Sequence, residues 1–404
     1  MKIKNATVAL FAALAASALI AATPVIRPET VSFSQAPNRL VTIGYTLEEA
    51  DAIVTVDILT NGVSIGAENY TNMYGDVNLR VSPGNKLIFW QPRKSWPNHM
   101  FTNNEVSVEV KAWDVAVPPD YMVIDLVNRS DALRYYTGEE ALPGGRSNDI
   151  YRTTKLIMRR IPAAGNTWTM GSPEGEADRV AAREVQRLVT MTNDFFMSIY
   201  PVTRGQQFYG GIDESQNSNM LVPASVTYNN IRGKGWPTNG HAVVTGHMKT
   251  WRDNFGIDFD MPTSAQWEFA CRAGHGGAFF FDDEGAYKSS STFNALKPYA
   301  WYNGNATALH PPGEKLPNPY GIYDMHGNAW EWCLDFVDKP SADPVVEPVG
   351  PKYEEQASGD SGKRVQRGGN YNNPPGTCRA AKVNPKEATA SCGYRLVCPV
   401  TLKW

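Results

Sequence analysis

The feature that most limits the possible fold is the amino-acid composition beyond Leu156, where aromatic-rich segments alternate with Gly, Asn and Pro. Aromatic residues make up 11% of the chain and include 11 Trp. Because glycine and proline interrupt helices and central strands, we expect few regular elements in this region. Most of its residues must then lie in loops that aromatic packing and backbone hydrogen bonds hold in place.

Two short helices are nevertheless indicated there. The first is expected from Ser264 to Arg272, because Thr263 is a suitable N-cap and Glu268 is placed to support the first turns. The second is expected around residues 204–209, directly after a Pro-Val-Thr segment.

The N-terminal part of the chain has a different pattern, in which apolar and polar residues alternate as they do in β-strands. The strand candidates are residues 40–44, 53–59, 63–65, 86–90 and 106–113. Asn61 and Gly62 separate two of them, and this pair favours a hairpin because both turn residues must accept positive φ. We therefore expect a small all-β domain, an antiparallel sandwich or sheet, over residues 25–114. It contains no catalytic constellation, which favours a spacer or adhesion module.

Residues 115–151 are expected to form a linker to a larger C-terminal domain, residues 152–404. The Pro-Pro pair at residues 118–119 and the Pro-Gly-Gly segment at residues 143–145 are typical of turns. Between them, the apolar piece from Tyr121 to Val127 can add one strand to a neighbouring sheet.

The N-terminus has the order of a secretory signal peptide, which we place at residues 1–22. Lys2 and Lys4 precede an uncharged, alanine-rich run that ends in small residues before Thr23. A membrane anchor is the alternative, but the run is short for a span, which needs about 20 residues. No later stretch is long and apolar enough to cross a bilayer, so we expect no span after cleavage. The mature protein is then secreted or part of a bacterial envelope, in the periplasm, at the cell surface or outside the cell.

Charge and cysteine content exclude some partners. With 38 basic and 41 acidic residues the formal charge is -3, which argues against a nucleic-acid partner or a polybasic membrane contact. No close CxxC pair is present, which argues against a zinc site. One disulfide is plausible in an exported protein, and the odd count leaves at least one thiol unpaired. The five cysteines are Cys271, Cys333, Cys378, Cys392 and Cys398.

Five segments, in this order along the chain, carry a family resemblance. They are residues 167–172 with 189–203, 261–272, 317–332, 364–371, and 378–381 with 393–396. Together they resemble the sulfatase-modifying-factor family, which is named for the formylglycine-generating enzyme, over about residues 152–398. The resemblance implies an α+β, C-type-lectin-like domain that has little regular secondary structure and loops pinned by calcium ions.

The resemblance implies a structural calcium site in the Asp324 to Trp332 segment. Its candidate ligands are Asp324, the carbonyls of Gly327 and Ala329, and Glu331. Carboxylate and carbonyl oxygens are the hard ligands that calcium takes. The alternative is a metal-free turn in which the two tryptophans of the segment fill the core. The family also implies a disulfide between Cys271 and Cys378.

The catalytic residues of the family are missing. Its oxidase chemistry needs two thiolates that bind copper(I) just after an Arg-Gly-Gly-Ser-aromatic segment, and soft sulfur ligands are what copper(I) selects. Here residues 367–371 read Arg-Gly-Gly-Asn-Tyr, and Asn372 stands at the first cysteine position. No second spare cysteine precedes the Arg-Ala-Ala segment at residues 379–381. We therefore predict no bound copper and no catalytic residue.

These observations favour a non-catalytic binding module with an unknown protein, peptide or glycan ligand. The segment at the family's active-site position offers amides and an aromatic ring, and its predicted ligand-binding residues are Asn370, Tyr371, Asn372 and Asn373. The alternatives are a formylglycine-generating oxidoreductase that acts on a sulfatase cysteine, and a purely structural envelope component.

Overall fold

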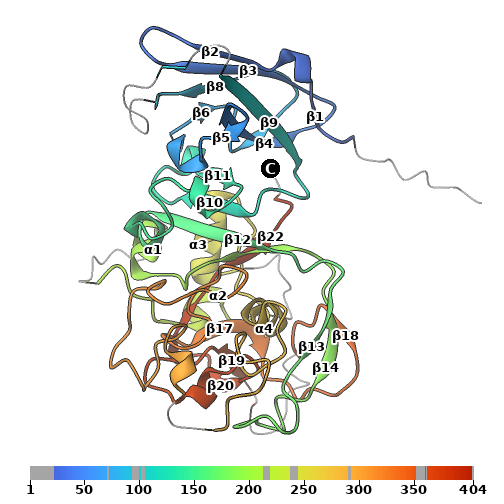
Figure 1. Cartoon of the computed structure of the whole chain (residues 1–404). Helices are drawn as coiled ribbons and strands as arrows, with labels where there is room; N and C mark the ends of the chain where they lie inside the picture. Colours follow the sequence, from blue (N-terminus) through green and yellow to red (C-terminus); the bar gives the residue numbers. More distant parts are fainter. Residues whose placement is uncertain are drawn as a thin grey trace, which may run out of the picture.

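A computed structural model describes residues 22–70, 72–92, 100–101, 105–212, 219–236, 244–289, 293–351, 360 and 362–402. The predicted signal peptide, residues 1–22, lies outside this part of the chain except for its last residue. None of the described helices is long and apolar enough to cross a membrane. Figure 1 shows an N-terminal β domain (blue) stacked on a larger C-terminal domain (green to red).

The N-terminal domain is the predicted sandwich of two antiparallel sheets. One sheet holds β1 (Val25–Ile26), β2 (Ser32–Gln35), β3 (Val41–Glu48), β6 (Tyr74–Gly75) and β8 (Gly84–Trp90). The other holds β4 (Ala52–Thr60), β5 (Val63–Ser64), β7 (Arg80–Val81) and β9 (Val106–Asp114). Every second residue of β3 is buried, starting at Val41, so one face of this strand packs on the opposite sheet.

The predicted hairpin is confirmed between β4 and β5. Thr60 pairs with Val63, and the two residues between them have positive φ, 51° at Asn61 and 76° at Gly62. These angles are those of the two-residue turn that matches the twist of paired strands.

The segment predicted as a linker, residues 115–151, is instead part of the C-terminal domain. It contributes two strands, β10 (Tyr121–Asp125) and β11 (Leu133–Tyr136), where the sequence indicated at most one. β10 pairs with both β11 and β12 (Lys155–Ile161). Residues 121–124 are all buried, because β10 is covered on both faces, and the linker prediction is therefore wrong.

The described residues of the C-terminal domain form three small sheets and four α-helices. The first sheet runs β11-β10-β12-β15-β22, and its last two strands are β15 (Phe195–Ser198) and β22 (Val397–Pro399). The second contains β13 (Thr167–Met170), β14 (Arg187–Thr190) and β18 (Val345–Val346). The third contains β16 (Val226–Thr227), β21 (Ser391–Tyr394), β17 (Glu331–Phe336), β19 (Lys363–Arg367) and β20 (Asn384–Glu387). The helices are α1 (Arg204–Tyr209), α2 (Tyr228–Arg232), α3 (Gly246–Phe255) and α4 (Ser264–Arg272).

Both predicted helices are confirmed, with one correction to the reasoning. The side chain of Thr263 accepts from Gln266 N, and the Gln266 side chain accepts from Thr263 N, so Gln266 rather than Glu268 completes the capping box of α4. Helices α2 and α3 had not been predicted. The N-cap of α3, Thr245, makes no side-chain capping bond and a glycine follows it, so its start signal is weak.

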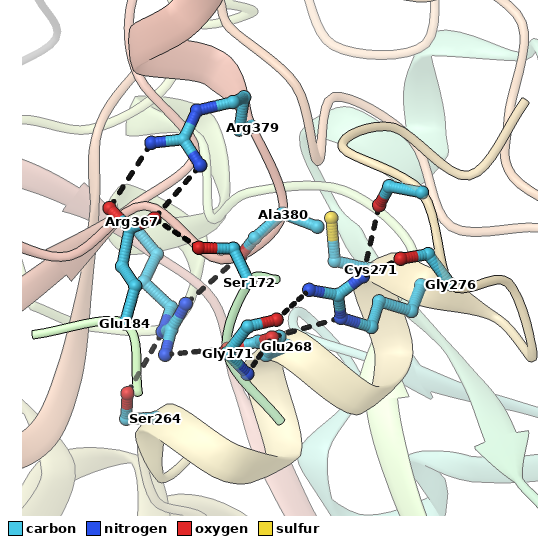
Figure 2. A network of polar contacts seen from close by, with 12 residues as sticks. Gly171, Ser172, Glu184, Ser264, Glu268, Cys271, Gly276, Arg367, Arg379 and Ala380 are labelled. Atoms are coloured by element: carbon cyan, nitrogen blue, oxygen red, sulfur yellow. Dashed lines mark hydrogen bonds and ion pairs between the residues drawn. The ribbon is translucent and has the colours of Figure 1, made fainter. Parts of the chain in front are cut away.

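Buried ion pairs connect the loops of this domain. Arg395 contacts both carboxylate oxygens of Glu331, at 2.6 and 2.8 Å, and donates to the carbonyl oxygens of Ser198, Ile199 and Tyr323. Figure 2 shows a second network, in which Glu268 accepts from Gly171 N and from Arg272, and Arg379 contacts Glu184. These charges are almost fully buried, so each must find a partner inside the protein.

We expect the variant Arg395→Met to lose about 3–5 kcal/mol of unfolding free energy, because it leaves the Glu331 carboxylate buried without its counter-charge. The matched control is Lys249→Ala in α3, whose pair with Asp253 is more than half exposed and which should lose no more than about 1 kcal/mol. Urea unfolding followed by tryptophan fluorescence measures both. Equal losses in the two variants would contradict the assigned role of Arg395.

Candidate functional site

The predicted ligand segment is a tight turn whose backbone donors are all used within the protein. Asn370 N donates to Asn373 Oδ1 at 3.0 Å, and Asn372 N donates to Asn370 Oδ1 at 3.1 Å. Asn373 N donates to Asn370 O, and Tyr371 N donates to Asn328 O, both at 3.0 Å. The structure thus brings the four predicted residues together, and any hydrogen-bond donor that the turn offers to a ligand must come from a side chain.

Gly369 allows the 370–373 turn to pack closely against the core. Its φ is +76°, and a Cβ at this position would lie 2.7 Å from Cys378 Sγ and 3.1 Å from Thr377 O. Any larger residue would therefore push the turn away from the core.

Asn328, which sequence reasoning did not single out, connects three loops. Its side chain accepts from His310 N and donates to His310 O, both at 3.1 Å, while its backbone N donates to Trp301 O at 2.7 Å. Its backbone O accepts from Tyr371 N, and Asn303 N donates to Asn373 O at 3.1 Å. Loops 301–310, 324–331 and 370–373 consequently form one surface, which we call the Asn328 surface.

An aromatic stack lies on the Asn328 surface. The rings of Trp301 and His310 are nearly parallel, with 3.7 Å between centroids and 8° between planes. Lys315 Nζ lies 3.8 Å from the Trp301 ring centroid. Since His310 already covers one face of the indole, the ammonium group must lie on the other. His310 also contacts Glu314 at 3.1 Å, so the charges here nearly cancel.

The predicted calcium ligands have different environments. Glu331 uses both carboxylate oxygens, on Arg395 and on Trp267 Nε1, the latter at 2.7 Å. Asp324 has neutral hydrogen-bond partners, Gly313 N at 2.8 Å and Asn328 Nδ2 at 3.3 Å. Burial raises the pKa of Asp324 to about 6. Within the described ranges, no three His, Cys, Asp or Glu side chains converge as a metal site.

All five cysteines are buried free thiols, and the expected Cys271–Cys378 disulfide is not formed. The His326 ring occupies the neighbourhood of both residues. Its Nδ1 is 2.8 Å from Cys378 O, and its Nε2 is 3.8 Å from Cys271 Sγ. Burial lowers the pKa of His326 to about 4, so the ring is neutral. The disulfide prediction is therefore wrong.

The cysteines also lack the properties of reactive thiols. Burial raises the pKa of Cys378 to about 12 and raises the pKa of each of the other four thiols above the ordinary value. Reactive cysteines are partly exposed and have lowered pKa values. Asn372, predicted from the sequence to stand at the family's first catalytic position, is exposed and offers an amide, which does not suit copper(I). The residues present therefore do not fit the family's copper centre.

A cleft of about 900 Å³ lies elsewhere on the domain and involves none of the predicted ligand residues. Its lining includes Asp194, Arg252, Asp258 and Val397. Asp258 lies 3.9 Å from Arg252, and Asp194 lies 2.9 Å from Arg160, so these carboxylates have partners within the protein.

Thiol counting tests the state of the cysteines. We expect five alkylated cysteines per chain when the protein is unfolded without reductant, and none when the folded protein is exposed briefly to the same reagent, because every thiol is buried. Intact-mass spectrometry reads both numbers. Three labels after unfolding would reveal one disulfide, and rapid labelling of the folded protein would reveal an accessible thiol.

Comparisons with known proteins identify the family of the C-terminal domain. Residues 158–399 match the family profile described as "Sulfatase-modifying factor enzyme 1-like domain". The chain is 26% identical over 293 residues to "Serine/threonine-protein kinase pkn1" of Chlamydia pneumoniae, which covers 67% of this chain and 41% of that protein. It is 26% identical over 191 residues to "Formylglycine-generating enzyme" of Streptomyces coelicolor, which covers 41% of this chain and 59% of that protein. The chain thus spans about half of the length of these relatives.

Among solved structures, PvdO from Pseudomonas aeruginosa is similar with a TM-score of 0.46 and 22% identity, over 60% of this chain and 94% of that one. The matched family region covers more than half of the chain and contains all the motifs that carried the resemblance. The chain therefore belongs to the family of sulfatase-modifying factor enzyme 1-like domains, the family of the formylglycine-generating enzyme.

Proposed function

We propose that this protein is an exported, non-catalytic binding module of its family. The observation that carries the proposal is the state of the sulfur atoms: all five thiols are buried with raised pKa values, and an exposed asparagine, Asn372, stands where the family's first catalytic cysteine is expected. Without a thiolate pair the family's oxidation of a substrate cysteine has no copper ligands. The proposed place of action is the periplasm, the cell surface or the medium, in keeping with the signal-like N-terminus.

The framework around the 370–373 turn supports a role in recognition. Asn328 holds the turn through one hydrogen bond and the 301–310 loop through three, and Asn303 N adds a bond to Asn373 O, so these loops need little further ordering when a ligand binds. A preorganised surface loses less conformational entropy on association. Binding at the Asn328 surface thus fits a fold in which the segment at the family's active-site position is kept rigid.

The proposal has a test with two readouts. We expect no aldehyde when the purified protein is incubated with copper(I) and a Cys-x-Pro-x-Arg peptide, under conditions in which the Streptomyces coelicolor formylglycine-generating enzyme converts the peptide. We also expect the triple variant Tyr371→Ala, Asn372→Ala, Asn373→Ala to stay folded and to lose a ligand that the parent protein captures from envelope extract. The Tyr74→Ala variant, altered at an exposed tyrosine of the N-terminal sheet, is the control that keeps capture.

Mass spectrometry of the peptide and of the captured material gives both results. Aldehyde formation would overturn the non-catalytic assignment in favour of an oxidoreductase. Equal capture by the triple variant would favour a purely structural envelope component.

A structural calcium ion at Asp324 is part of the proposal. Asp324 and Glu331 are two buried carboxylates, and Arg395 pairs directly with Glu331 alone. The remaining negative charge at Asp324 is costly, as its raised pKa indicates, and a cation would neutralise it. Asp324 and the carbonyls of Gly327 and Ala329, which follow it closely in sequence, would hold the ion, whereas Glu331 is already engaged by Arg395.

Thermal unfolding in calcium and in EDTA tests the calcium site. In EDTA, stability should fall as the pH rises from about 4 to about 6, because the folded pKa of Asp324 lies above its unfolded value and the folded protein binds the extra proton. Calcium should raise the midpoint by roughly 5 °C at pH 7.5, and by less at pH 5, where protons compete for the carboxylate.

Asp324→Asn should abolish the calcium effect. Asp335→Asn should keep it, because Asp335 is an equally buried carboxyl whose pKa is also raised to about 6, yet it bonds to Ser264 N and lies outside the predicted ligand set. If calcium does not change the thermal midpoint of the parent protein at either pH, the result argues for the metal-free turn.

A further inference from the structure

We infer that the ligand site extends across the Asn328 surface to Trp301, Asn303 and His310, and that its ligand is a neutral glycan. This inference rests on the proposed binding function and names the class of ligand for the same site.

The turn at residues 370–373 has no backbone donor to offer a peptide. The N–H groups of Asn370, Tyr371, Asn372 and Asn373 each donate to an acceptor of this chain. A peptide that adds as a strand relies on free main-chain groups along an edge. The hydrogen-bond donors that a ligand meets at this turn must instead come from side chains.

The side chains available are mainly amides. Asn303 and Asn372 are exposed, and within the described residues their side-chain amides have no hydrogen-bond partner. An asparagine amide both donates and accepts, which matches a sugar hydroxyl, itself a donor and an acceptor. A carboxylate or ammonium ligand would need an excess of opposite charge, and this surface has a single lysine, Lys315, beside Glu314.

Aromatic rings on the Asn328 surface offer stacking contacts for a sugar ring. Lys315 and His310 cover the two faces of Trp301, so the indole acts as a support rather than as a contact surface. The His310 side chain is 32% exposed although its ring is stacked on Trp301. Tyr371 is partly exposed on the same surface. The C–H faces of a pyranose ring stack on such rings, while its hydroxyls reach the neighbouring amides.

Rigidity connects these groups into one site. Asn328 holds the backbone of His310 by two bonds and the backbone of Tyr371 by one, and Asn303 N is bonded to Asn373 O. The stacking rings and the amides consequently have fixed spacing, which a regular oligosaccharide can match without ordering the protein.

The test uses the full chain and a printed array of linear hexaoses of glucose, mannose, xylose and N-acetylglucosamine, with anionic oligosaccharides and a random peptide library on the same array. We expect the parent protein to bind at least one neutral hexaose. Asn303→Ala, His310→Ala and Tyr371→Ala should each weaken that binding about 10-fold or more, a loss of about 1.4 kcal/mol. The thermal midpoints of Asn303→Ala and Tyr371→Ala should stay unchanged, because both residues are at least partly exposed. His310→Ala also loses the stack on Trp301, so its binding is measured well below its own midpoint. Tyr74→Ala should bind like the parent.

Each other outcome has a defined meaning. The glycan assignment fails if the parent binds no neutral hexaose, or if it binds one equally well after all three substitutions. Binding of peptides that requires Tyr371, without glycan binding, also overturns the inference but leaves the proposed binding function intact. Conversion of the cysteine peptide to an aldehyde removes the proposed function itself, so the two failures are distinguishable.

Discussion

The pairing of Glu331 with Arg395 in the dry interior is the interaction on which the C-terminal domain depends. Besides its two contacts with the carboxylate, the guanidinium donates to carbonyls at residues 198, 199 and 323. It therefore joins β15, β17, the chain after β21 and the turn before residue 324. A guanidinium group has five N–H donors in a planar fork, which suits carbonyls that arrive from several directions.

Other buried arginines also donate to several backbone carbonyls at once. Arg364 donates to the carbonyls of Leu334 and Trp236, and Arg272 donates to those of Gly171, Gly276 and Gly277. Loop carbonyls buried away from water need donors just as those in a sheet do. Charged donors in matched pairs with Glu268 and Glu331 let a domain with short strands bury its loops.

Elements with local signals could be predicted from the sequence, whereas those set by distant contacts could not. Helices α1 and α4 each begin with a capping box of a threonine and a glutamine, so residues close in sequence determine where these helices start. The hairpin at Asn61-Gly62 is equally local. By contrast, the connector before β12 looked like a linker because its prolines and glycines are visible in the sequence, while its pairing with β12 depends on the fold. The Cys271–Cys378 bridge was inferred from relatives and could not account for the His326 ring between these residues.

The candidate site also has a part that could be predicted from the sequence and a part that depends on contacts between distant segments. The 370–373 turn was found because the family motif marks the position, and Asn328 lies within another motif, but its contacts with His310 and Tyr371 join segments far apart in the sequence. Asn372 makes one backbone contact and faces solvent, so an exchange of cysteine for asparagine there leaves the buried ion pairs untouched. Because buried ion pairs hold the framework, the residue at position 372 contributes little to the shape of the turn, and exposed loops of this kind can differ in sequence while the scaffold stays fixed.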